Sequence, residues 1–214
     1  MNSAGNDIVA LAAIDVARTR QPQFYSRIIT PAEQELYSLN FKDQLAFEHF
    51  VWLAWSVKES AYKFLKRFEP QLVFSPTRMV TSGLHFTGEY FEGTIRSGDR
   101  LLYSQSLISK EYIFSMVNRE KDFSDVCFEI GQVDSIEPED QSIAVRELLV
   151  RKLSQIYPES LQIVKNSNGW PVILDNGEEL PIPVSFTHHG HFVAYTYHLS
   201  LTSWKAYPHH AEVL

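Results

Sequence analysis

The sequence of 214 residues has a single cysteine, Cys127, and few basic residues. One thiol forms no internal disulfide and no thiolate zinc cage, so stability must come from a hydrophobic core. Nineteen Lys and Arg against 26 Asp and Glu give a formal net charge of −7. Proteins that bind nucleic acids usually carry an excess of basic side chains to neutralise phosphates. The composition therefore disfavours nucleic acid as a partner.

Long apolar runs are also missing. No uninterrupted apolar stretch reaches the roughly 20 residues that are needed to cross a bilayer, and residues 1–7 lack the basic charge that opens a secretory signal. We therefore expect a cytoplasmic protein that has no membrane partner.

Hydrophobic patterning predicts a mixed fold. The apolar run 8–14 predicts a buried strand that ends at Asp15. Thr30, Pro31 and Glu33 predict a capped helix start. Amphipathic helices are expected over about 43–67 and 139–157. Further strands are expected over 78–86, 89–95, 100–107, 112–117, 161–165, 170–174, 184–187 and 191–199. Helix followed by strands occurs twice, which predicts an α+β fold of two similar halves.

The acidic segment 134–140 contains Pro138 and is the expected linker. It divides the chain into residues 1–133 and residues 134–214. We expect one active-site cleft that both halves share.

Three places along the chain suit phosphate chemistry. Glu59 and Lys63 lie one helical turn apart, and a carboxylate beside an ammonium can hold a divalent cation with its phosphate ligand. The same spacing also occurs in plain surface ion pairs worth about 0.3–0.5 kcal/mol. Asp15 is either an acid of the site or the cap of the next turn. The segment 185–190 offers hydroxyls and imidazoles to phosphate oxygens, or forms an ordinary hairpin.

Together these segments resemble one enzyme family. The residues Trp55-Ser56-Val57-Lys58-Glu59-Ser60, followed by Lys63, resemble the W-x-x-K-E-S-x-x-K signature of 4′-phosphopantetheinyl transferases. Ile14-Asp15-Val16 resembles the G-I-D-I strand end of that family, and residues 27–33 resemble its R-I-F-T-x-x-E element. Gly169-Trp170-Pro171 and residues 185–190 resemble its G-K-P and S-x-S-H-S-G pair. The resemblance covers most of residues 8–198.

The resemblance implies a pseudo-dimer of two α+β halves in one chain, which favours a monomer. In the larger, surfactin-synthetase-type enzymes the G-K-P half comes first, so the halves here would stand in permuted order. The competing description is a small holo-acyl-carrier-protein synthase core with a β-rich insertion, which would permit a trimer.

The resemblance also implies an activity. Such enzymes transfer 4′-phosphopantetheine from coenzyme A to a serine of an apo acyl or peptidyl carrier protein, in lipid or secondary-metabolite biosynthesis. They depend on magnesium and release adenosine 3′,5′-bisphosphate. By this resemblance Asp15 and Glu59 hold Mg²⁺, Glu59 or a metal-bound water is the base, and Lys63 assists catalysis. The residues implied to surround coenzyme A are Lys58, Lys63, Gly169, Thr187 and His188, and those implied to dock the carrier are Arg18, Arg20 and Arg27.

Four positions depart from the family pattern. Ala13 stands where the glycine before Ile14-Asp15 is usual, and Thr187 replaces a serine but keeps the hydroxyl. Ala17 stands where the larger enzymes often have a second acid, and Trp170 replaces the cation of G-K-P. The last two leave an alternative open, namely a non-catalytic relative that binds carrier protein or coenzyme A.

Overall fold

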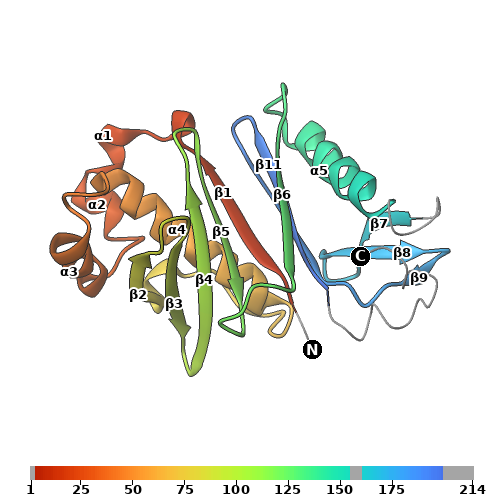
Figure 1. Ribbon diagram of the computed structural model, residues 1–214, viewed down its shortest axis with the longest axis horizontal. Helices are drawn as coiled ribbons and strands as arrows, with labels where there is room; N and C mark the ends of the chain where they lie inside the picture. The colour runs from red at the N-terminus through yellow and green to blue at the C-terminus, as the bar shows by residue number, and fades with distance from the viewer. Residues whose placement is uncertain (1–2, 155–160, 200–214) are drawn as a thin grey trace.

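The computed structural model describes residues 3–154 and 161–199, which form a mixed α+β fold with antiparallel sheets (Figure 1). The first part of the chain contains β1 (Gly5–Ala10), η1 (Leu11–Ala13), α1 (Val16–Thr19), α2 (Pro22–Tyr25), α3 (Pro31–Asn40), α4 (Phe47–Lys66), η2 (Pro76–Arg78), β2 (Met79–Phe86), β3 (Phe91–Ser97), β4 (Arg100–Ile108) and β5 (Tyr112–Asn118). The second part contains β6 (Val126–Gln132), α5 (Pro138–Leu153), β7 (Leu161–Lys165), β8 (Pro171–Asp175), β9 (Glu178–Glu179), β10 (Val184–His189) and β11 (Phe192–His198).

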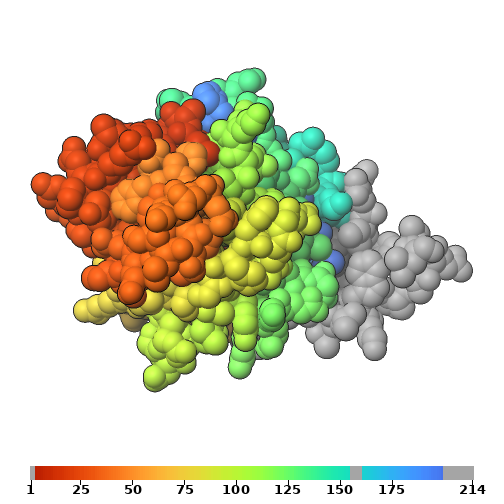
Figure 2. Space-filling view, turned by 60° about the vertical axis from the view of Figure 1, so that its left-hand side comes forward, coloured from red at the N-terminus to blue at the C-terminus, as the bar shows by residue number. Residues whose placement is uncertain are grey.

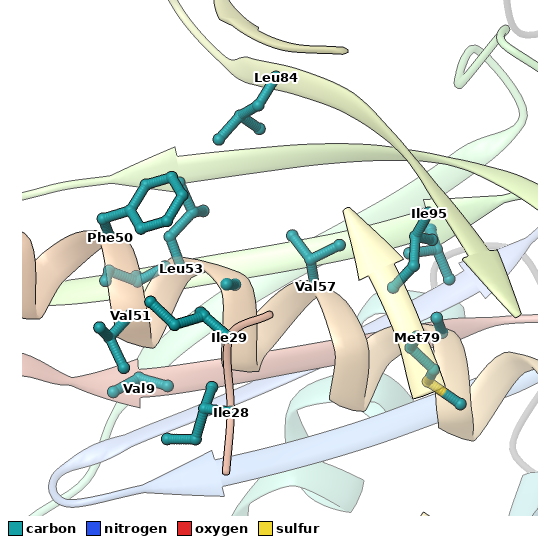
Figure 3. Close-up of a cluster of buried hydrophobic side chains, with 14 of the residues drawn as sticks. Val9, Ile28, Ile29, Phe50, Val51, Leu53, Val57, Met79, Leu84 and Ile95 are labelled. Atoms are coloured by element: carbon teal, nitrogen blue, oxygen red, sulfur yellow. The ribbon is translucent and has the colours of Figure 1, made fainter. Parts of the chain in front are cut away.

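The first sheet has five antiparallel strands in the order β1-β5-β4-β3-β2, and α4 packs against one of its faces. Apolar residues recur along α4 at three- and four-residue spacing, so one side of the helix is buried. Figure 3 shows Leu53 and Val57 of this side in the same cluster as Val9 of β1 and Ile95 of β3. This core fixes the rotation of α4 about its axis and therefore fixes which residues face away from the sheet.

The second sheet has the order β10-β11-β6, and α5 packs against β10 and β11. The short strands β7, β8 and β9 form a third sheet. Strand β6 was not predicted, and a boundary after residue 133 would assign it to the first half. Its pairing with β11, from Gln132↔Phe192 to Val126↔His198, places it in the second sheet instead. In each large sheet, the first strand of that part of the chain pairs with its last described strand: β1 pairs with β5, and β6 pairs with β11.

The two large sheets meet where β1 lies beside β10 (Figure 1). One edge of β1 pairs with β5, so the amides on its other edge need partners from elsewhere. The amide of Ile8 donates to Oγ1 of Thr187 at 3.2 Å, and the amide of Ala10 donates to Nδ1 of His189 at 2.9 Å. Side chains of β10 thus satisfy the free edge of β1, and they bring β10 against the first sheet.

Several local predictions are confirmed, and one is displaced. Thr30 and Glu33 form the predicted capping box. The long helix begins at Phe47 rather than near residue 43, and α5 covers 138–153, while its predicted continuation lies largely outside the described residues. The first strand begins at Gly5 and ends at Ala10, whereas residues 11–13 form a 3-10 turn. None of the described helices combines the length and the apolar composition that spanning a membrane requires.

Gly5, the first residue of β1, lies directly against the backbone of α4. A Cβ atom at this position would lie 2.2 Å from the carbonyl oxygen of Ser60 and 2.8 Å from the amide nitrogen of Phe64. Both atoms belong to the backbone of α4, which has no flexible end to move aside. Glycine therefore lets strand and helix approach closely.

Candidate active site

A cavity of about 390 Å³ lies between α4 and the second part of the chain. Glu59 and Lys63 line it from α4, and His188 lines it from β10. The turn between β7 and β8 contributes Gly169, whose positive φ of 81° suits a residue without a side chain, together with Trp170. The structure thus brings Glu59, Lys63, Gly169 and His188 to one cavity.

Asp7 of β1 is a buried acid next to this wall, and its side chain is only 10% exposed. Its Oδ1 accepts a hydrogen bond from Oγ1 of Thr187 at 3.1 Å and lies 3.3 Å from Nζ of Lys63. Its Oδ2 is buried and has no hydrogen-bond partner among the described residues. Burial raises the pKa of Asp7, while Lys63 and Thr187 act in the opposite direction. Asp7 is not among the site residues that were predicted from the sequence.

The Glu59 carboxylate is close enough to Asp7 for the two charges to interact. Burial raises the pKa of Glu59, Lys63 lowers it, and the neighbouring charge of Asp7 raises it further. A buried and a half-buried carboxylate that repel each other are suited to share a cation. The ammonium of Lys63 interacts with both and partly compensates this repulsion.

The donor set fits magnesium. No group of three or more His, Cys, Asp or Glu that could hold a metal occurs in the described part of the chain. Magnesium often binds through one or two carboxylates and completes its shell with water and substrate phosphates. Asp7 offers a buried oxygen that has no hydrogen-bond partner in the described ranges, and Glu59 offers a carboxylate on the cavity wall. These two acids are the residues that could hold the ion.

Asp15 lies elsewhere. It is exposed and caps α1, where its Oδ1 accepts from the amide of Arg18 at 2.9 Å. In the same helix, Thr19 accepts a hydrogen bond from Trp52. Trp52 precedes Glu59 by seven residues, which corresponds to roughly 10 Å along a helix. The expected pairing of Asp15 with Glu59 is therefore corrected, because the predicted strand end was displaced and the acid that approaches Glu59 is Asp7.

Lys58 also differs from expectation. Consecutive helical residues point about 100° apart, so when Glu59 faces the cavity its neighbour faces the interior. The Lys58 side chain is 0% exposed, and its Nζ lies 2.7 Å from Oε2 of Glu33 and 2.7 Å from the carbonyl oxygen of Ile28. Burial lowers the pKa of Lys58, and Glu33 raises it. This lysine therefore binds α3 and the loop before it, and does not reach a ligand in the cavity.

Thr187 likewise faces inward. It is 4% exposed, and its hydroxyl is engaged by Asp7 and by the amide of Ile8. His188, the next residue, is exposed and lines the cavity. Burial lowers the pKa of His188, and Lys63 lowers it further, so the neutral imidazole is favoured at neutral pH. The direct contact with phosphate that was expected for Thr187 is thus replaced by a contact with an acid of the site.

The first part of the sequence decides the family. A model of the 4′-phosphopantetheinyl transferase superfamily matches residues 3–116, which is more than half of the chain and includes Asp7, Glu59 and Lys63. The chain belongs to this superfamily. No match was found among the curated proteins with which the sequence was compared.

Membership in the 4′-phosphopantetheinyl transferase superfamily shows which signal could have identified Asp7. Gly5-Asn6-Asp7-Ile8 contains the glycine and the aspartate of the G-I-D-I element, whereas Ile14-Asp15-Val16 has Ala13 in place of the glycine. If Gly5-Asn6-Asp7-Ile8 is the segment that matches the motif, its glycine is present at Gly5, and Ala13 is no longer a departure from the family pattern. Gly5 also lies against the backbone of α4. Two residues after Asp7 stands buried Val9, so a second acid at this spacing is absent here as well.

The departure at Trp170 has a structural counterpart at Arg67, the residue directly after α4. The guanidinium of Arg67 lies 5.9 Å from the centre of the Trp170 ring and donates to the carbonyl oxygens of Pro171 and Val184. Burial lowers the pKa of Arg67 to about 10, which leaves it charged at neutral pH. A fixed cation therefore stands beside the tryptophan that replaces the usual cation of the motif.

The three arginines that were expected to dock a carrier are all exposed. Figure 2 shows the segment that carries them, coloured red, on the outside of the molecule. Arg20 is paired with Glu48 at 2.9 Å, and Arg18 lies 5.0 Å from the centre of the Phe24 ring. Arg27 lies in the turn after α2.

Proposed function

We propose that this protein transfers 4′-phosphopantetheine from coenzyme A to a serine of an apo acyl or peptidyl carrier protein in a magnesium-dependent reaction. One observation carries the proposal: Lys63 interacts with two carboxylates, the half-buried Glu59 on the wall of a cavity and the buried Asp7 behind it, and basic side chains also line this cavity. These basic residues are Lys63, Lys66, Arg67, Arg146 and Lys165.

The reaction joins a serine oxygen to phosphorus. The serine hydroxyl attacks the phosphorus that bears pantetheine, the bond from that phosphorus to the bridging oxygen breaks, and adenosine 3′,5′-bisphosphate leaves. The serine proton must pass to a base. Positioning and electrostatic stabilisation supply most of the acceleration in phosphoryl transfer. Magnesium, when it is held by Asp7 and Glu59, would supply positive charge to the pyrophosphate oxygens.

Glu59 and Lys63 have the chemistry for two of these tasks. Burial raises the pKa of Glu59, which moves this carboxylate toward the range where a general base is effective at neutral pH. Lys63 has three N–H donors. Its hydrogen bonds to the carbonyl oxygen of Asn6 at 2.9 Å and to Asp7 use two of them, so one remains for a phosphate oxygen.

The remaining cavity residues would bind coenzyme A. His188, as a neutral imidazole, can donate to a phosphate oxygen, and Gly169 lets the backbone approach a ligand closely. The carrier would dock over the exposed Arg18, Arg20 and Arg27, because carrier proteins of this class are acidic. We propose that one chain suffices, since both parts of it line the cavity.

The test compares two acids of the same chain. Apo-carrier is incubated with coenzyme A, magnesium and each enzyme variant, and mass spectrometry follows the addition of phosphopantetheine. We expect Asp7→Asn and Glu59→Gln to lower the rate by about 10²-fold or more. The matched control, Asp15→Asn, should leave the rate unchanged. An equal loss in the Asp7 and Asp15 variants would refute the site, and a wild-type protein that binds coenzyme A but never modifies a carrier would favour the non-catalytic alternative.

A further inference from the structure

Thr187 holds an unusual position for a hydroxyl group. It lies on β10, in the second part of the chain, yet both of its hydrogen bonds reach β1, about 180 residues away in sequence. Its oxygen accepts from the amide of Ile8 at 3.2 Å, so its single proton is free to point at Oδ1 of Asp7 at 3.1 Å. The backbone of β1 thereby fixes the direction of the hydroxyl proton.

This geometry fixes the carboxylate as well. Oδ1 of Asp7 is held by Thr187 and Lys63, and Oδ2 is left buried without a partner among the residues described. A buried polar atom without a partner is destabilising, and native proteins keep few of them. The arrangement therefore leaves Oδ2, in a fixed orientation, as the carboxylate oxygen that no hydrogen-bond donor among the described residues engages.

We propose that Thr187 is a positioning residue, which orients Asp7 so that Oδ2 is presented to the catalytic cation. This inference rests on the proposed function. Hydrogen bonds to a ligating carboxylate typically change metal affinity by about 10- to 100-fold. Thr187 would thus act through Asp7 and not by touching coenzyme A.

The neighbouring strand offers a matched control. Thr196 of β11 is 1% exposed, and its hydroxyl makes no hydrogen bond to a described residue. Thr196→Val removes a buried hydroxyl from the same sheet without removing a contact to Asp7. Thr187→Val removes the hydroxyl and keeps the shape, and Thr187→Ser keeps the hydroxyl and removes a methyl group.

The experiment measures Mn²⁺ binding, with free Mn²⁺ followed by its electron paramagnetic resonance signal, without and with coenzyme A. We expect Thr187→Val to raise the Kd for Mn²⁺ by about 10- to 100-fold. Thr187→Ser and Thr196→Val should leave it close to the wild-type value. If Thr187→Val does not fold, Thr187→Cys replaces it, because the thiol is a weaker donor and should also raise the Kd.

Two failures are distinguishable. If Asp7→Asn abolishes Mn²⁺ binding while the Thr187 variants bind like wild type, Thr187 does not position the acid and this inference is overturned. If Asp7→Asn binds Mn²⁺ as tightly as wild type, Asp7 is not a ligand, and the metal site of the proposed function fails together with the inference.

Discussion

Lys58 provides a sharp test, because the structure and the sequence motif assign it different roles. The side chains of Lys58 and Glu33 are both 0% exposed, and their charged atoms lie 2.7 Å apart. Removing the ammonium leaves the Glu33 carboxylate buried, and the donors that remain to it among the residues the structure describes are Thr30 and the amide of Thr81. Loss of one partner of a buried ion pair costs about 3–5 kcal/mol. Lys58→Met should therefore lower the free energy of unfolding by about this amount.

The effect is large enough for a thermal assay. In a protein of this size, each kcal/mol shifts the melting temperature by about 2–4 °C, so we expect a decrease of about 6–20 °C. Calorimetry measures the shift, and the exposed Lys42→Met is the control that should not change it. The double variant Glu33→Gln/Lys58→Met should recover part of the loss, because no buried charge remains unpaired.

Enzyme kinetics separate the two roles of Lys58. If the lysine is structural, Lys58→Met below its melting temperature keeps the wild-type KM for coenzyme A. The reasoning is refuted if this variant is as stable as wild type but has a strongly raised KM, since Lys58 would then contact the substrate.

Two further predictions concern the edge of β1 and the arginine surface. Burial lowers the pKa of His189, whose Nδ1 accepts from Ala10, so its folded pKa lies below the unfolded value of about 6.5. Its contribution to stability is then complete above pH 6.5 and is lost as the pH falls. Between pH 7 and 5 the free energy of unfolding should fall more in wild type than in His189→Gln, by at most about 1.4 kcal/mol per pH unit. Denaturant titrations at each pH measure it, and the same pH dependence in both proteins would contradict the prediction. Charge reversal of Arg18, Arg20 and Arg27 should raise the KM for an acidic carrier and leave coenzyme A binding intact in calorimetry; unchanged carrier kinetics would exclude this docking surface.

Signals that act within a few residues were predictable from the sequence. The capping box of Thr30 and Glu33 and the amphipathic pattern of α4 are such signals, and both are present in the structure. The first strand was displaced because its apolar run continues through Leu11–Ala13, which form an exposed or half-buried turn. The bounds of β1 coincide with its pairing to β5, from Gly5↔Val117 to Ala10↔Tyr112, and Gly5 also lies against Ser60 and Phe64 of α4. These contacts join residues far apart in the sequence, which hydrophobic patterning does not contain.

The direction of a side chain was harder to predict than its presence in a motif. Lys58 and Glu59 stand side by side in one signature, yet one is sealed in the core and the other lines the cavity. The packing of α4 sets the direction of both side chains, and Glu33, on a different helix, supplies the partner of the buried lysine. Strand β6 is a similar case, because its strand partner within the described part of the chain is β11, whose paired residues lie 60 to 72 positions later.

The environment of Asp7 links the assembly of the fold to the proposed chemistry. The acid lies on β1, its ammonium partner comes from α4, and its hydroxyl partner comes from β10. Residues 3–116, which the family model matches, supply the first two but not the third. Because burial opposes ionisation of Asp7, while Lys63 and Thr187 favour it, the charged acid depends on both parts of the chain. The amides of Ile8 and Ala10 on the free edge of β1 also take their hydrogen-bond acceptors from β10. Packing of the second sheet against β1 therefore both satisfies this edge and orients Asp7.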